Sequence, residues 1–216
     1  MFDPSHHALV QSLSGETMSY PVFFNQVRKI TVHDPLAQLL GANSDGNIEY
    51  SYTDAVKLAG HSCPTVAGAY LMTLKALESL YKGQTPQRGG VKVKFRDGLD
   101  EGVAGVIANI VSLLTGCAAE GGFKGLGGNY VRRDLLMFNA PLNDQVLFQR
   151  MDTGATVSVS YHPEIVPLEP SVMGLLRKIL AGQAQAGEKE EFANGWQDRV
   201  RRILEQIDNP ELVVCS

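Results

Sequence analysis

The sequence predicts an α/β fold of the α+β type, in which helices pack on a mixed sheet and a helical extension follows at the C-terminus. Helical and strand patterns are interspersed along the chain, and two of the strands form a hairpin, which favours a mixed sheet over a purely parallel one. The last two patterns are both helical. We therefore divide the chain into an α/β domain over residues 1–167 and a helical extension over residues 168–216.

The composition is that of a chain that buries a full-sized core. Of the 216 residues, 44% are hydrophobic and 19% are charged, so folding needs neither disulfides nor a metal ion. The net charge of -4 argues against a nucleic-acid partner, which would require a broad basic patch. No apolar run reaches the ~20 residues of a membrane span, and the N-terminal residues lack the pattern of a signal peptide. We expect a soluble, cytoplasmic protein with reduced cysteines.

Four helices are predicted in the first 120 residues. The first begins at Pro35 with Asp34 as its cap, and the second is capped by Thr53 and ended by Gly60. The third is apolar on most of its circumference and is therefore expected to be buried. Its apolar positions are Val66, Ala67, Tyr70, Leu71, Leu74, Leu77 and Leu80. The fourth, also apolar, covers residues 102–115.

The strand patterns follow the third helix. Apolar residues at every second position predict a half-buried strand over residues 91–95. Another strand is expected over residues 130–138. Residues 146–150 and 156–161 predict a hairpin, because an Asp-Thr-Gly turn separates them.

The C-terminal extension is predicted to contain helices over residues 171–180 and 188–207. The last helix carries an apolar stripe that consists of Phe192, Trp196, Val200, Ile203, Leu204 and Ile207. Either the chain's own domain or a second copy must cover this stripe. Because a two-fold pair is the commonest arrangement between copies, we expect a homodimer.

The segment from Gly60 to Pro64 contains the residues best suited to chemistry. Pro64 fits the first turn of the following helix, which places Cys63 at or beside the N-cap, where the helix dipole favours a thiolate. His61 lies two residues earlier. An imidazole and a thiolate so placed suit metal ligation, or a nucleophile beside its base. The other interpretation is a buried thiol and a histidine that bonds to the backbone.

A second cysteine follows an apolar helix. Cys117 comes directly after Gly116, the residue predicted to end the helix over residues 102–115. We expect the two apolar helices to be neighbours, so that the start of one meets the end of the other and Cys117 joins His61 and Cys63. A core cysteine is the alternative. Cys215 is the penultimate residue and is expected to be frayed.

Residues 121–128 form a glycine-rich segment that allows backbone to approach a ligand closely. The segment matches neither the phosphate-binding loop nor the dinucleotide-binding fingerprint. Lys124, flanked by Gly125 and Gly127, is the candidate to hold an anion there. An exposed lysine on a flexible loop is the other interpretation.

Together, the Gly-His-x-Cys-Pro segment at residues 60–64 and the Thr-Gly-Cys at residues 115–117 with its glycine-rich sequel resemble the FmdE family. This family is named for one component of molybdenum- or tungsten-dependent formylmethanofuran dehydrogenase, and the resemblance covers roughly residues 50–140. It implies an α/β domain that dimerises, with His and Cys positions close enough to share a metal, zinc by expectation. The C-terminal zinc ribbon of several members is missing here.

Our leading hypothesis is a metal site in which His61, Cys63 and Cys117 hold zinc or another divalent transition metal. Three protein ligands leave one coordination position for water or a small molecule. Two alternatives remain open. One is a metal-free thiol enzyme with Cys63 as nucleophile and His61 as base, and the other is a small-molecule binding module that uses the glycine-rich segment and Lys124. The sequence names no substrate.

Overall fold

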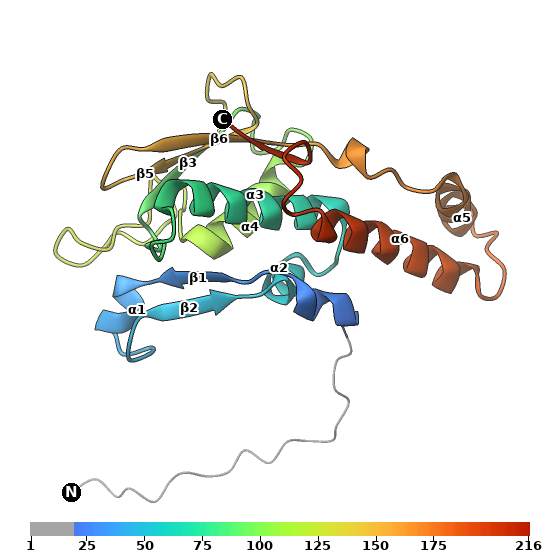
Figure 1. Cartoon of the computed structure of the whole chain (residues 1–216), viewed down its shortest axis with the longest axis horizontal. Helices are drawn as coiled ribbons and strands as arrows, with labels where there is room; N and C mark the ends of the chain where they lie inside the picture. The colour runs from blue at the N-terminus through green and yellow to red at the C-terminus, as the bar shows by residue number, and fades with distance from the viewer. Residues whose placement is uncertain (1–19) are drawn as a thin grey trace, which may run out of the picture.

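The computed structural model of the chain describes residues 20–216 and shows three layers (Figure 1). A five-stranded mixed sheet forms one outer layer, with strand order β4-β3-β5-β6-β7, and only its β3–β4 pair is parallel. An antiparallel pair, β1–β2, forms the opposite layer. Helices α3 and α4 lie between the two layers. This architecture confirms the predicted α+β class.

The element bounds are as follows. The strands are β1 (Ile30–His33), β2 (Asn47–Tyr50), β3 (Val91–Phe95), β4 (Leu136–Met137), β5 (Val146–Arg150), β6 (Thr156–Tyr161) and β7 (Val213–Cys215). The helices are α1 (Pro35–Leu39), α2 (Tyr52–Ala59), α3 (Pro64–Tyr81), α4 (Ala104–Thr115), α5 (Pro170–Leu180) and α6 (Glu188–Glu205), with short 3-10 turns η1 (Val22–Gln26) and η2 (Pro163–Ile165). The predicted hairpin has the bounds of β5 and β6.

Helix α3 is the centre of the fold. It packs on β6 and β7 of the large sheet, on α4 and α2, and on α6. Consequently 13 of its 18 residues are buried, which confirms the prediction that a helix apolar on most of its circumference is buried. The helix approaches β6 so closely at Gly68 that a Cβ there would overlap the ring of Tyr161. Glycine is therefore required at this crossing.

Three local predictions are corrected by the structure. The N-cap of α2 is Ser51 and not Thr53, which already lies within the first turn of the helix. The Asp54 carboxylate accepts a hydrogen bond from the backbone N–H of Ser51 at 2.8 Å, as in a capping box. The strand expected over residues 130–138 shrinks to β4, since Tyr130 and Asp134 have positive φ angles that no strand accommodates. Cys215 is not frayed: it lies in β7 and pairs with Val159 of β6.

The extension is divided between the body and a projecting arm. The C-terminal half of α6 packs against α3 and buries Val200, Ile203 and Leu204, so the chain itself covers this part of the apolar stripe. The N-terminal half of α6 and all of α5 project away from the sheet (Figure 1). β7 then returns to the edge of the large sheet, beside β6.

Among residues 20–216, no helix combines the length and the apolar character that a membrane crossing requires. The expectation that the N-terminus carries no signal peptide concerns residues outside the described range. The predicted Asp34 cap is present, because its Oδ1 accepts hydrogen bonds from the backbone of Leu36 and Ala37.

The contact between Gly68 and Tyr161 yields a stability prediction. Gly68→Ala should lower the free energy of unfolding by about 1–3 kcal/mol, because the added methyl forces α3 away from β6. Gly174→Ala is the matched control: Gly174 lies within α5, and a Cβ there meets nothing within 4 Å, so the change should be within about 1 kcal/mol and stabilising. Urea unfolding followed by circular dichroism measures both, and equal stability of the two variants would contradict the prediction.

Candidate functional site

The loop from Gly60 to Pro64 is held by three different elements. Cys63 is the N-cap of α3 and Pro64 occupies its first turn, as the sequence predicts. The Ser62 carbonyl accepts hydrogen bonds from Trp196 Nε1 at 3.2 Å and Gln197 Nε2 at 3.0 Å, both on α6. The Ser62 hydroxyl lies 2.9 Å from the Tyr52 hydroxyl on α2. These bonds preorganise the loop that carries both chemical groups.

His61 is exposed, and its tautomer follows from one hydrogen bond. Its Nδ1 lies 3.0 Å from the Ala59 carbonyl oxygen. Because a carbonyl only accepts, Nδ1 carries the proton, and Nε2 of the neutral ring keeps its lone pair. Metal-binding histidines are oriented in this way, and a histidine that acts as a base needs the same free lone pair.

Cys63 is half-buried and packs against the core beside two phenols. Burial raises the pKa values of Tyr52 and Tyr161. The hydrogen bond between Ser62 and Tyr52 and the charge of Arg199 near Tyr161 lower these pKa values by less than burial raises them. Both phenols are consequently protonated at neutral pH. The Tyr161 hydroxyl donates a hydrogen bond to the Pro64 carbonyl at 3.0 Å.

A cavity of about 160 Å³, here called the α3–α4 cavity, is lined by the residues that directly follow Cys63, although Cys63 and His61 themselves do not line it. The starts of both helices line it, through Pro64 and Thr65 of α3 and through Val103 and Ala104 at α4. The remaining lining residues are Phe95, Asp97, Ile107, Gln145, Val146, Tyr161 and Pro163. The cavity thus combines apolar walls with a few polar groups, which is the usual make-up of a small-molecule site.

Cys117 does not join this site within the chain. Because the starts of α3 and α4 line one cavity, the two helices run parallel, and Cys117 follows the far end of α4, ~18 Å away along its axis. Cys117 is 1% exposed, and burial raises the pKa of its thiol. Within residues 20–216, no three His, Cys, Asp or Glu side chains are grouped closely enough to hold a metal ion.

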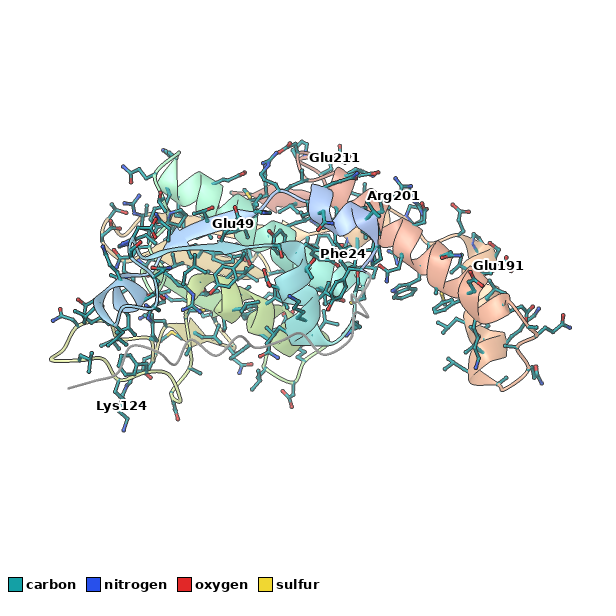
Figure 2. The ribbon with its side chains drawn as sticks, turned by 90° about the horizontal axis from the view of Figure 1, so that it is seen from below. Phe24, Glu49, Lys124, Glu191, Arg201 and Glu211 are labelled. Carbon is teal, nitrogen blue, oxygen red and sulfur yellow. The ribbon has the colours of Figure 1, made fainter. Side chains whose placement is uncertain are left out.

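The glycine-rich segment forms an irregular loop that doubles back on itself. Leu126 and Asn129 exchange backbone hydrogen bonds at 2.9 Å, and the positive φ angles of Gly125 and Gly127 allow this turn. Lys124 is exposed and extends away from the body (Figure 2). Neither it nor the two glycines line the α3–α4 cavity.

The returning limb of this loop lines a second hollow instead, here called the arginine cleft. Its lining residues are Pro35, Gln87, Arg88, Gly89, Asn129, Tyr130, Val131 and Arg132. Sequence reasoning did not single out Arg88 or Arg132 as functional. Their common partner, Asp34, was identified only as a helix cap, and it lies 98 positions from Arg132 in the chain.

Comparison with known proteins adds no relative: no protein-family model matches the sequence, and no curated protein matches it either.

The different environments of the cysteines predict a difference in alkylation. Iodoacetamide should modify Cys63 at least about tenfold faster than Cys117 at pH 7.5, because Cys117 is buried and its pKa is raised. Peptide mapping by mass spectrometry measures each site separately, in a Cys215→Ser background that removes the exposed third thiol. Equal alkylation rates at Cys63 and Cys117 would contradict the prediction, because Cys63 would then be no more accessible to the reagent than the buried thiol.

Proposed function

We propose that the protein binds a small molecule in the α3–α4 cavity and that Cys63 and His61 are the groups that act on it. The observation that carries this proposal is the position of the cavity, whose lining begins at Pro64 and Thr65, the residues directly after Cys63. Asp97 and Gln145 supply polar groups to its lining. Such groups orient a ligand that the apolar walls bind.

Zinc, or another divalent transition metal, is the cofactor that we propose for Cys63 and His61. The hydrogen bond from His61 Nδ1 to Ala59 supports this, because it leaves Nε2 free in the way that metal-bound histidines require. The resemblance to the FmdE family points the same way. Since Cys117 lies at the far end of α4, the remaining coordination positions belong to water and to the bound molecule, which makes the site an open one.

Metal analysis of two matched variants tests the cofactor. We expect protein purified without a histidine tag to contain close to one equivalent of metal, Cys63→Ser to lose it, and Cys117→Ser to keep it, since hydroxyls are poor ligands for soft sites. Elemental analysis by mass spectrometry gives the metal content. Full occupancy in Cys63→Ser would refute the assignment, and loss in Cys117→Ser would mean that a second copy contributes Cys117.

The alternative is a metal-free thiol enzyme in which Cys63 is the nucleophile and His61 its base. The free lone pair of His61 Nε2 is the observation that favours it. Treatment with a chelator distinguishes the metal site from the metal-free enzyme. If the rate of Cys63 alkylation is unaffected by the chelator but is slower in His61→Asn, the metal-free enzyme is supported.

We also propose that the chain functions in the cytoplasm as a homodimer. The three cysteines are free, which suits a reducing compartment. The projecting arm offers apolar side chains outside the core, because Met173 is 37% and Leu180 is 78% exposed. An arm of two helices that leaves such residues open is suited to a second copy.

The dimer is tested on the arm itself. Met173→Glu with Leu180→Glu should produce a folded monomer by light scattering, because charged residues would be buried between the copies. Leu40→Glu is the control, since Leu40 is 65% exposed at the end of α1, away from the arm. A wild-type protein that is monomeric at tens of micromolar would contradict the proposal.

A further inference from the structure

Arg88 and Arg132 share one buried carboxylate, that of Asp34. This cluster lies near the C-terminal end of α4, away from Cys63. The side chain of Arg132 donates from Nη2 to Asp34 Oδ1 at 2.7 Å, and Arg88 donates from Nη1 to Asp34 Oδ2 at 3.1 Å. Asp34 is 4% exposed and Arg132 is 7% exposed. In the described part of the chain, Asp34 is the one acid that pairs with either arginine, so the cluster holds an excess positive charge.

The carboxylate of Asp34 already accepts hydrogen bonds from four donors. Besides the two arginines, its Oδ1 accepts the backbone N–H groups of Leu36 at 3.0 Å and Ala37 at 3.1 Å. Burial raises the pKa of Asp34, but the Ala37 bond and the charges of Arg132 and Arg88 more than offset this, and the carboxyl stays ionised. Neither Arg132 Nη1 nor Arg88 Nε is among the donors to this carboxylate.

Two arginine nitrogens remain without an acceptor. Arg132 Nη1 and Arg88 Nε are buried, and neither has a hydrogen-bond partner among residues 20–216. Buried donors in proteins are nearly always paired, and an unpaired charged donor is costly. Burial and the neighbouring charge of Arg88 also lower the pKa of Arg132, although Asp34 raises it. The cluster thus lacks a hydrogen-bond acceptor for these nitrogens and a second negative charge to balance the two arginines.

The backbone around Arg132 is shaped to hold it in this position. Gly89 and Gly116 both have positive φ angles, and a Cβ on either would overlap Arg132 Nη1. The cleft beside it has a volume of about 280 Å³ and is lined by both arginines and by residues 129–131 of the glycine-rich loop. Both arginines thus line an open hollow, while their two unpaired nitrogens are covered by the surrounding chain.

We infer that the arginine cleft binds the oxyanion group of a small molecule, a carboxylate or a phosphate, and that the side chains of Arg132 and Arg88, which line the cleft, turn to donate their unpaired N–H groups to it. A guanidinium presents donors in a planar fork that matches either oxyanion, and the anion supplies the missing negative charge. This inference assigns anion binding to Arg88 and Arg132, in place of the expectation for Lys124 in the glycine-rich segment. The inference is independent of the α3–α4 cavity, because the two hollows lie at opposite ends of α4.

Thermal unfolding of the full chain tests this inference with two probes, inorganic phosphate and acetate, against chloride at constant ionic strength. Binding to the folded state alone raises the midpoint with ligand concentration. We expect a saturable rise for wild type with at least one probe, and the probe with the larger rise identifies the oxyanion. Arg133→Gln is the matched control, because Arg133 is adjacent but exposed and paired with Asp134 at 2.8 Å, and it should keep the rise.

Arg132→Gln should abolish the rise. Since this variant removes a buried residue and could fail to fold, Arg88→Lys provides a second test: lysine keeps the charge beside Asp34 but lacks the Nε–H donor. We expect Arg88→Lys to weaken binding about tenfold or more. No rise in wild type with either probe, or a rise in Arg88→Lys equal to that of wild type, would overturn the inference.

Discussion

The burial of α3 between two β layers is the constraint on which the rest of the structure depends. The helix contacts the large sheet on one side and α2 and α4 on others, so small residues are needed along it. Ala67, Gly68, Ala69 and Ala76 supply them. Because most of its surface is covered, the chemical groups discussed above lie at the ends of α3. Cys63 stands at the first end, and the chain reaches Arg88 seven residues after the last.

The direction of α4 decides which residues meet at those ends. A single strand, β3, separates the two helices and returns the chain to the end at which α3 began, so α4 runs parallel to α3. The two starts therefore share a cavity, and Cys117 is carried to the end where Arg88 and Arg132 lie. The expectation that Cys117 meets Cys63 requires antiparallel helices. The single strand between them gives parallel helices instead, because the chain reverses direction once before β3 and once after it.

Local patterns in the sequence predicted the elements well where the physical cause is local. The cap at Asp34, the buried face of α3 and the β5–β6 hairpin all depend on neighbouring residues, and the structure confirms them. The Asp34–Arg132 pair depends on a contact across 98 positions, which periodicity cannot report. The missing strand at residues 130–135 has a similar origin. Its backbone takes positive φ angles at Tyr130 and Asp134, where it curves past Arg132, and side-chain alternation alone does not reveal such a turn.

The division of the chain at residue 167 separates residues that the structure joins. Trp196 and Gln197 of α6 donate the two hydrogen bonds that hold the Ser62 carbonyl, so the predicted extension supports the loop of Cys63 and His61. Gln197 Oε1 is also buried and has no donor among residues 20–216, which leaves one acceptor next to this loop for an additional hydrogen bond. A displacement of α6 must break both bonds to Ser62. The position of α6 is therefore coupled to the candidate site, although α6 contributes neither thiol nor imidazole to it.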